Sequence, residues 1–390
     1  MPVLNRIADL HPALTAIRRD FHMHPELDFD VHRTAGIVAQ KMRDFGCDEV
    51  HEGIGRTGVV AIIKGRTNTS GKVIGMRADM DALPIHEASG VEHSSTTPGK
   101  MHACGHDGHT TMLLGAAQIL AETRNFDGTV AIIFQPAEEG GGGGREMVEA
   151  GMMDRFGIHE VYGMHNMPGI PVGAFAMRKG AIMAAADHFD ISITGHGGHA
   201  ARPHACIDTA VVAAHVLLAV QSIVSRNVDP IDNAVVTIGA VHTDNDTYNI
   251  IPQTVTMKGT ARTLSTSVQD LIEERLPLIV KRTAEAYGAT AEVHYHRNYP
   301  VTISSDDEVA FAARVARDVA GDAAVDDDTA PMMGAEDFSF MLNKRPGAYI
   351  FVGNGDTAGV HHPAYDFDDE AIPYGTSYWV RLAEMAMPVK

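Results

Sequence analysis

The sequence predicts an α/β protein with two domains, a mostly parallel-sheet domain and a ferredoxin-like βαββαβ domain inserted into it. Two observations lead to this prediction. Short, continuous apolar runs alternate with helical patterns in the first part of the chain, and from about residue 187 they give way to strands in which apolar and polar residues alternate. At 390 residues the chain is also too long for one ordinary hydrophobic core, so two domains are expected.

Four continuous apolar runs predict buried strands in the first part, at residues 58–63, 73–76, 129–134 and 161–164. A strand that is covered on both faces has such a run, which is typical of a parallel sheet. A helical pattern fills residues 108–123, between the second and third runs. The same style returns after residue 299, with a helix near residues 308–319 and a strand at residues 348–352.

The middle of the chain has a different order of elements. The pattern predicts, in turn, a half-exposed strand at 188–194, a helix at 207–225, strands at 234–241 and 254–261, a helix near 268–287 and a strand at 291–296. This order is the split unit of a ferredoxin-like sandwich, which can fold as its own body. We therefore expect residues 187–297 to form the inserted domain, and residues 1–186 and 298–390 to form the larger domain.

Composition narrows the possible functions. Apolar residues make up 45% and charged residues 21% of the chain, as in a soluble globular protein. The chain has no run of about eighteen apolar residues and no apolar signal core near its N-terminus, so we expect a cytoplasmic protein without a membrane span. The net charge of -19, without a basic stripe, argues against a nucleic-acid partner. Three scattered cysteines are too few for a disulfide framework and fit a reducing compartment.

Residues that can bind metal follow several of the predicted strands. In an open parallel sheet, ligands bind beyond the carboxyl ends of the strands. Five segments place His, Cys or carboxylate side chains at that edge or just before the helix at 108–123. They contribute Asp79 and Asp81, Cys104 and His106, Glu138 and Glu139, His165, and His361 and His362. This convergence, more than any single motif, predicts a metal site.

Each segment also has a structural alternative. Cys104 and His106 could be a buried thiol beside a helix-capping histidine, and His165 could be a core histidine. Glu138 and Glu139 could be a solvated pair, although unpaired buried carboxylates are costly. Metal binding accounts for all the segments together. Thiolate and imidazole suit zinc, carboxylate admits manganese, and five ligands suit two divalent ions that share one ligand. One glutamate then binds metal, and the other can take a proton from the attacking water.

Eight motifs match one known family. They are RADMDALPI (77–85), HACGHDGH (102–109), QPAEEG (135–140), GMHNMP (163–168), GHGGHAARP (195–203), NIIP (249–252), GAEDF (334–338) and HHPAYDF (361–367). The chain resembles the M20 metallopeptidase family in its aminoacylase and hippurate-hydrolase branch, which also includes plant auxin-conjugate hydrolases. The resemblance spans nearly the whole chain in the expected order and implies a split catalytic domain that carries an inserted lid.

The resemblance implies a role for each residue of the metal site. Cys104 would bridge two metals, His106 and His165 would complete one site, and Glu139 and His361 would complete the other. Glu138 would be the general base, and Asp81 would be a supporting aspartate. His361 is chosen over His362 because relatives often have His-Ser-Pro at this position.

The resemblance also implies roles for three residues of the lid. His199 would polarise the scissile carbonyl, and in dimeric relatives this histidine comes from the partner chain. Asn249 and Arg262 would hold the carboxylate of the amino-acid product, although Arg262 could instead be a solvated strand end. A homodimer or homotetramer formed through the lid domain is expected.

The expected function is a metal-dependent amidohydrolase that cleaves an N-acyl amino acid into a carboxylic acid and a free amino acid, with two divalent ions (Zn or Mn) per chain. The acyl group and the amino acid remain open. One alternative is a cysteine hydrolase with Cys104 as nucleophile and His109 or His106 as base. A second is a non-catalytic protein that binds metal or a small molecule on the same fold. The segment at residues 21–27 (FHMHPEL) has two histidines and is expected to be a helix end stopped by Pro25.

Overall fold

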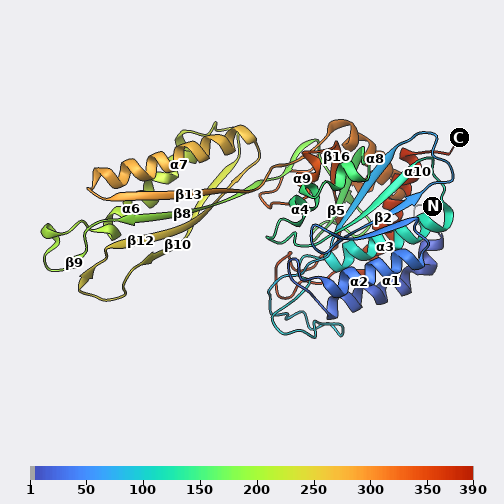
Figure 1. Cartoon of the computed structure of the whole chain (residues 1–390), viewed down its shortest axis with the longest axis horizontal. Coiled ribbons are helices and arrows are strands. Elements are labelled where there is room, and N and C mark those ends of the chain that lie inside the picture. The colour runs from blue at the N-terminus through green and yellow to red at the C-terminus, as the bar shows by residue number, and fades with distance from the viewer. Residues whose placement is uncertain (1–4, 390) are drawn as a thin grey trace. The chain divides into compact units, whose positions relative to one another are not determined.

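The structure is a computed structural model that describes residues 5–389. The chain divides into two compact units. The larger unit is formed by the described residues up to Ile182, by Ile303–Ala330 and by the chain from Asp337 onward. The smaller unit is formed by Met183–Thr302 and Pro331–Glu336. Figure 1 shows the elements of each unit.

The larger unit contains an eight-stranded sheet with the order β1-β2-β4-β3-β5-β16-β6-β15. Its strands are β1 (Glu49–Ile54), β2 (Gly58–Lys64), β3 (Val73–Asp79), β4 (Thr129–Gln135), β5 (Glu160–Met167), β6 (Phe175–Ala176), β15 (Val325–Asp326) and β16 (Gly347–Gly353). The four central strands β4, β3, β5 and β16 are parallel, which confirms the predicted fold class. Strand β2 is antiparallel to both of its neighbours, β1 and β4. Its apolar run indicated burial on both faces but could not indicate direction, because both kinds of strand are buried here.

Helices cover both faces of this sheet. One face packs against α1 (Asn5–Met23), α2 (His32–Asp44), α3 (His106–Thr123), α8 (Asp306–Ala320) and α10 (Ile372–Ala386), and this side holds the main hydrophobic core. In Figure 1, α1, α2 and α3 lie together along the lower side of the sheet. The shorter helices α4 (Gly143–Glu149), α5 (Met152–Arg155) and α9 (Ser339–Leu342) lie outside that core. Near these helices, Ile158 lies close to Gly75 of β3, and the guanidinium of Arg77 in β3 lies over the ring of Phe338, the residue before α9. As the sequence predicted, α1 ends before Pro25.

The smaller unit is built on an antiparallel sheet with the order β10-β12-β8-β13. The strands are β8 (Ala185–Thr194), β10 (Ala234–Thr243), β12 (Thr254–Thr263) and β13 (Thr290–Tyr299), and the helices are α6 (Thr209–Arg226) and α7 (Thr266–Ala286). The chain order is βαββαβ, which agrees with the predicted pattern. Both helices pack into one apolar core with the sheet. The remaining short strands are β7 (Gly180–Met183), β9 (Gly198–His199), β11 (Ile250–Ile251) and β14 (Thr302–Ser304), and β9 pairs with β11.

Helix α6 is unusually apolar for a helix with so much exposed surface. Among the described residues it is the one helix long and apolar enough to cross a membrane by length and composition, but only 33% of its 18-residue window is buried. Val212, Val216 and Val220 face the core of the smaller unit. Val211 and Leu218 are exposed, the latter by 68%. The helix therefore has two apolar faces, one of which the unit itself covers.

Candidate metal centre

The five predicted ligands come together at the carboxyl edge of the central sheet. His106 is the first residue of α3, and Cys104 precedes the N-cap residue Gly105. Glu139 follows β4, and His165 lies in β5. His361 lies in the loop after β16. The parallel strands deliver these side chains to one place because their carboxyl ends share an edge.

The ligand atoms form overlapping groups in which all atoms lie within 4.8 Å of one another. One group is Cys104, His106 and His165, and a second is Cys104, Glu139 and His361. The Cys104 Sγ atom lies 3.3 Å from His165 Nε2, and His361 Nε2 lies 3.3 Å from Glu139 Oε2. Cys104 belongs to both groups, which is the arrangement that a shared ligand requires.

Buried polar atoms in this cluster fit a bound cation. Three buried atoms have no hydrogen-bond partner within residues 5–389. They are the two ring nitrogens of His106 and the Oε1 atom of Glu139. The His106 Nε2 atom lies 3.8 Å from Glu139 Oε1. Unsatisfied buried groups of this kind are costly and call for an explanation such as an ion. The donor set of thiolate, imidazole and carboxylate suits zinc and its borderline neighbours.

The electrostatics of His106 lead to the same conclusion. Burial lowers the pKa of its imidazole, but the negative charges of Asp79 and Glu139 and the contact with Asp81 outweigh burial and raise that pKa to about 10. A site that stabilises a proton so strongly also stabilises other cations. Protons and metal ions therefore compete for His106.

Cys104 has the surroundings of a metal ligand and not of an activated nucleophile. Burial, followed by the charges of Glu139 and Glu138, raises the pKa of its thiol well above the ordinary value. A nucleophilic cysteine needs cationic neighbours that lower its pKa. The neighbours of Cys104 include the carboxylates of Glu139 and Glu138 and the ring of His165, and burial lowers the pKa of that imidazole well below its ordinary value, so His165 is no cationic neighbour. A bound cation would stabilise the thiolate in these surroundings. This argues against the cysteine-hydrolase alternative.

The Glu138–Glu139 pair is held by Asp81. The fully buried Asp81 carboxylate accepts hydrogen bonds from the backbone N–H of Glu138 at 2.9 Å and from that of Glu139 at 3.1 Å. The preceding residue, Ala137, has φ +53, a left-handed conformation that is unusual for a residue with a side chain. The following turn requires glycine at Gly143, because a Cβ atom there would lie 1.7 Å from the carbonyl oxygen of Pro136. This turn gives the two glutamates a fixed position.

Asp79, His109 and Asn166 lie behind the ligands and support them, a role that the sequence patterns did not predict. His109 Nδ1 donates to Asp79 Oδ1 at 2.6 Å, and the backbone N–H of Asn166 donates to His109 Nε2 at 2.8 Å. Both ring nitrogens of His109 are therefore occupied, which argues against a general-base role for it. The spacing of His106 and His109 could have indicated that His109 lies next to the ligands, because residues three apart share a helix face.

The predicted lid residues lie in the smaller unit, at two ends of it. His199 in β9 is opposite Ile250 of β11, and the Ala200 N–H donates to the Asn249 carbonyl at 3.0 Å, so His199 and Asn249 are neighbours. Both side chains are exposed. Arg262 lies in β12 opposite Ala186, near the start of β8. It is eight residues from Thr254, the end of β12 that follows β11 in the chain. At the rise of a β-strand this separates Arg262 from His199 and Asn249 by roughly 25 Å.

The two adjacent histidines of the last motif have different surroundings. His362 is exposed, and its Nδ1 accepts a hydrogen bond from the Ala364 N–H at 3.0 Å, while His361 lies with Glu139 and Cys104.

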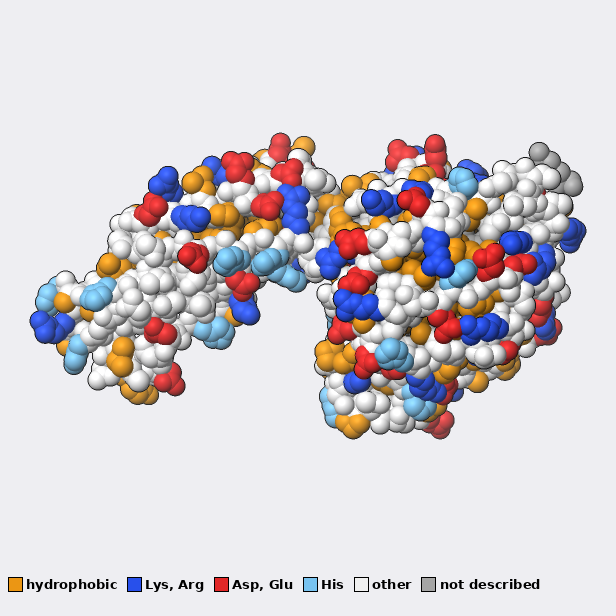
Figure 2. Space-filling model, viewed as in Figure 1, with side chains coloured by type: hydrophobic (Ala, Val, Ile, Leu, Met, Phe, Trp, Pro, Cys, Tyr) orange, Lys and Arg blue, Asp and Glu red, His pale blue; other side chains and the backbone are white. Residues whose placement is uncertain are grey.

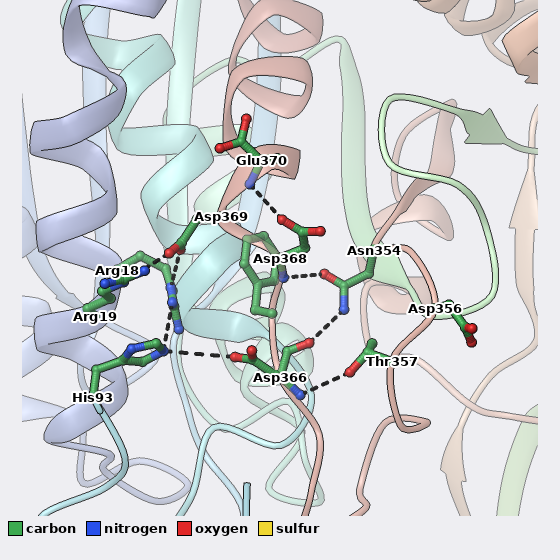
Figure 3. A pocket seen from close by; sticks show the side chains of 11 residues that line it. Arg18, Arg19, His93, Asn354, Asp356, Thr357, Asp366, Asp368, Asp369 and Glu370 are labelled. Atoms are coloured by element: carbon green, nitrogen blue, oxygen red, sulfur yellow. Dashed lines mark hydrogen bonds and ion pairs between the residues drawn. The ribbon is translucent and has the colours of Figure 1, made fainter. Parts of the chain in front are cut away.

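Figure 3 shows a separate cavity of the larger unit, in which the buried Arg18 donates to Asp369. Its lining residues are Arg18, Arg19, His93, Asn354, Asp356, Thr357, Asp366, Phe367, Asp368, Asp369 and Glu370.

Known proteins are similar to this chain in sequence and in fold. The family model for peptidase family M20/M25/M40 matches residues 75–385. A hippurate hydrolase from Campylobacter jejuni is 41% identical over 98% of this chain and 99% of the relative, and an N-acetylcysteine deacetylase from Bacillus subtilis is 37% identical over 97% of each. The crystal structure of the Bacillus subtilis YXEP protein, described as a dinuclear metal-binding peptidase of the M20 family, matches with a TM-score of 0.84 and 33% identity over 97% of this chain and 99% of that one.

These matches confirm the resemblance expected from the motifs. They extend over nearly the full length of the chain and of its relatives, so they concern both units. The ligand cluster lies within the residues that the family model matches. Independently of that match, its donor set suits a pair of divalent ions. The chain therefore belongs to peptidase family M20/M25/M40, and it is an amidohydrolase of that family.

Proposed function

We propose that this enzyme hydrolyses N-acyl amino acids to a carboxylic acid and a free amino acid. The observation that supports the proposal most directly is the position of Glu138, a buried carboxylate fixed by Asp81 next to a cluster of metal-binding side chains. The names of the hippurate hydrolase and the N-acetylcysteine deacetylase both describe N-acylated amino acids. An amide of this kind is therefore the first substrate class to consider.

We propose two divalent ions, Zn or Mn, as cofactors. Cys104 would be their common ligand, His106 and His165 would hold one ion, and Glu139 and His361 would hold the other. When bound, such a pair supplies Lewis acidity and lowers the pKa of water. The overlapping groups of ligand atoms that share Cys104 support this division.

Glu138 is the proposed general base. It would take a proton from the attacking water and later deliver it to the nitrogen of the leaving amino acid, as a positioned carboxylate can. Asp81 would keep Glu138 in place through the backbone bond and would not itself contact the substrate. Glu138 and Glu139 thereby have different tasks although they are adjacent.

The lid residues support a homo-oligomeric enzyme. His199 would polarise the scissile carbonyl, and Asn249 and Arg262 would hold the substrate carboxylate. Arg262 lies roughly 25 Å from the other two in the same lid, which is farther than one N-acyl amino acid can reach. One active site would therefore use Arg262 from one chain and His199 with Asn249 from another.

The smaller unit has surfaces that suit a second copy of the chain. Strand β10 lies at the edge of its sheet, and an unpaired edge is a template for pairing with another strand. Val235 and Val241 of β10 and Leu218 of α6 are large apolar side chains that are exposed in the single chain. We propose that residues 187–297 act as a lid through which two chains associate as a dimer, or as a tetramer of such dimers.

The charge pattern fits a small-molecule enzyme of the cytoplasm. Acidic and basic side chains are interspersed on the face of the larger unit shown in Figure 2. A mixed surface of this kind, with a net charge of -19, favours solubility over binding to nucleic acid.

A substrate screen tests the proposed function. The purified enzyme is incubated with N-benzoyl, N-acetyl, longer N-acyl and indole-acetyl amino acids, and release of free amine is measured. We expect activity on at least one series, loss of that activity with EDTA, and recovery with Zn or Mn. Activity that survives the chelator would support a thiol mechanism instead. A protein that binds metal but hydrolyses no member of the panel would be a binding protein on this fold.

A further inference from the structure

The segments of three candidate ligands meet at one buried side chain, Asn166. This residue follows His165 in β5 and is 0% exposed. Its carbonyl oxygen accepts a hydrogen bond from His165 Nδ1 at 2.5 Å, which leaves Nε2 of that ring to face Cys104. Its backbone N–H donates to His109 Nε2 at 2.8 Å. The backbone of Asn166 therefore sets the tautomer and orientation of His165.

The side-chain amide of Asn166 connects two other segments. Its Nδ2 group donates to the carbonyl oxygen of Cys104 at 2.6 Å, and its Oδ1 atom accepts a hydrogen bond from the Tyr365 hydroxyl at 2.7 Å. The Nδ2 atom also lies 2.9 Å from His109 Nε2. The amide is planar, so these contacts fix its rotation together. The contact is so close that Gly105 has no room for a side chain, since a Cβ atom there would lie 2.2 Å from Asn166 Nδ2 and 2.5 Å from the Tyr365 hydroxyl oxygen.

Tyr365 belongs to the loop that carries His361. The side chain of His361 is 53% exposed, and within its loop it depends on backbone contacts to stay near Glu139 Oε2, 3.3 Å away. Its backbone N–H donates to the Ala103 carbonyl at 2.7 Å. Tyr365, four residues later, is fully buried and is the second point at which this loop is joined to the Cys104 segment.

We propose that Tyr365 is a positioning residue that acts through Asn166 and couples the two halves of the metal centre. Its hydroxyl orients the Asn166 amide, the amide fixes the Cys104 segment, and the same bond anchors the loop of His361. Loss of the hydroxyl releases the loop of His361 from the amide and leaves the amide held at Nδ2 alone, by the Cys104 carbonyl and the His109 ring, so both Cys104 and His361 are less firmly placed. The inference rests on the proposed metal site, and it assigns to Tyr365 no contact with substrate.

Substitution of Tyr365 by phenylalanine removes one oxygen atom and tests the proposal. Cobalt(II) serves as the probe, because its charge-transfer absorption with a thiolate reports the Cys104 bond directly. We expect Tyr365→Phe to bind cobalt about 10- to 100-fold more weakly than the unmodified protein, as is typical when a residue that orients a metal ligand is lost. We also expect a weaker and shifted charge-transfer band at saturation.

Tyr378→Phe is the matched control. Tyr378 is also fully buried, but within the described part of the chain its hydroxyl has no hydrogen-bond partner. This variant should bind cobalt within about twofold of the unmodified protein, since the hydroxyl that it loses holds nothing in place. Equal losses of affinity in Tyr365→Phe and Tyr378→Phe would overturn the proposal, as would an unchanged affinity and band in Tyr365→Phe.

Asn166→Ala shows whether Tyr365 acts through Asn166. Alone, it should weaken cobalt binding at least as much as Tyr365→Phe, and it provides the measurement if Tyr365→Phe does not fold. In the double variant the Tyr365 change should add no more than about a twofold effect, because residues that act through one another are not additive. Full additivity would overturn the proposed connection.

Hydrolysis is measured in the same preparations to separate the two proposals. If the unmodified protein binds cobalt and the variants differ as expected, but no N-acyl amino acid is hydrolysed, the proposed function fails and the positioning role stands. If hydrolysis occurs and Tyr365→Phe binds cobalt normally, the positioning role alone fails. An unmodified protein that shows no cobalt–thiolate band would overturn the proposed role of Cys104 as a metal ligand and, with it, the positioning role.

Discussion

The carboxylate of Asp81 lies 2.9 Å from the backbone nitrogen of Glu138 and accepts its hydrogen bond in a fully buried position. The other carboxylate oxygen accepts the next N–H, that of Glu139. One aspartate on the loop after β3 thus holds the residues that follow β4. This bond orients the proposed general base through its backbone and leaves its side chain to face the ligand cluster.

Substitution of Asp81 by asparagine should impair both stability and activity. The amide can accept one of the two N–H bonds, but its NH₂ group then opposes the other donor. We expect a loss of about 1–3 kcal/mol in the free energy of unfolding, the cost of one unsatisfied buried group. Urea denaturation measures this loss, and kcat should fall while KM changes little. An unchanged kcat would contradict a role for Asp81 in placing Glu138.

Glu138→Gln should abolish most turnover and keep both metal ions. The amide fills the same space but cannot accept a proton at neutral pH, and general acid–base catalysis contributes about 10²- to 10⁴-fold. Metal content is measured by elemental analysis and turnover by amine release. A variant that retains metal and full activity would rule out Glu138 as the base.

His361 and His362 provide a comparison between adjacent histidines. His361 Nε2 lies 3.3 Å from Glu139, whereas His362 is exposed and bonds to the Ala364 N–H. We expect His361→Ala to weaken binding of one metal ion by more than about 100-fold, since even residues that only orient ligands cost 10- to 100-fold. His362→Ala should stay within about twofold. Isothermal titration with zinc distinguishes the two, and a reversed order would transfer the ligand role to His362.

His22 should make the stability of the larger unit depend on pH. Its ring lies between two carboxylates, with Nδ1 at 2.9 Å from Asp107 and Nε2 at 3.2 Å from Glu87. Burial lowers the pKa of His22, but the bonds and charges of Asp107 and Glu87 outweigh burial, with Arg18 nearby opposing them, and raise that pKa from 6.5 to about 9.

A raised pKa in the folded state stabilises the protein at low pH. The contribution of His22 is about 3 kcal/mol, fully present below pH 6.5, and it is lost as the pH rises through about 9. Urea unfolding of the unmodified protein and of His22→Gln at pH 6 and above pH 9 measures it. The difference in stability between the two proteins should shrink at the higher pH. A difference that is the same at both values would show that His22 is not charged in the folded protein.

Much of the fold and the outline of the site followed from the sequence. Continuous apolar runs located the central strands, and the residues after them met at one edge because parallel strands share a direction. The pattern could not give the antiparallel direction of β2, since burial is the same in both directions. The short strands β6 and β15 are two residues long and have no periodicity to detect.

The supporting residues of the site were beyond the reach of sequence patterns. The Asn166 amide joins Cys104, 62 residues earlier in the chain, to Tyr365, 199 residues later than Asn166, and no local spacing connects the three. The family resemblance assigned Arg262 and Asn249 together to the substrate carboxylate. Only the strand register shows that they lie at opposite ends of it. The roles of these lid residues remain predictions.

The ring of His106 and the Oε1 atom of Glu139, which have no hydrogen-bond partner within residues 5–389, also bear on how long the protein survives in a cell. Polar groups that are buried without a hydrogen bond raise the free energy of the folded chain, and an ion that binds them lowers it by an amount that grows with the logarithm of the ion concentration. Chains that fold while metal is scarce would open more often and be degraded sooner. The abundance of this enzyme, and not only its activity, would then follow the supply of divalent metal.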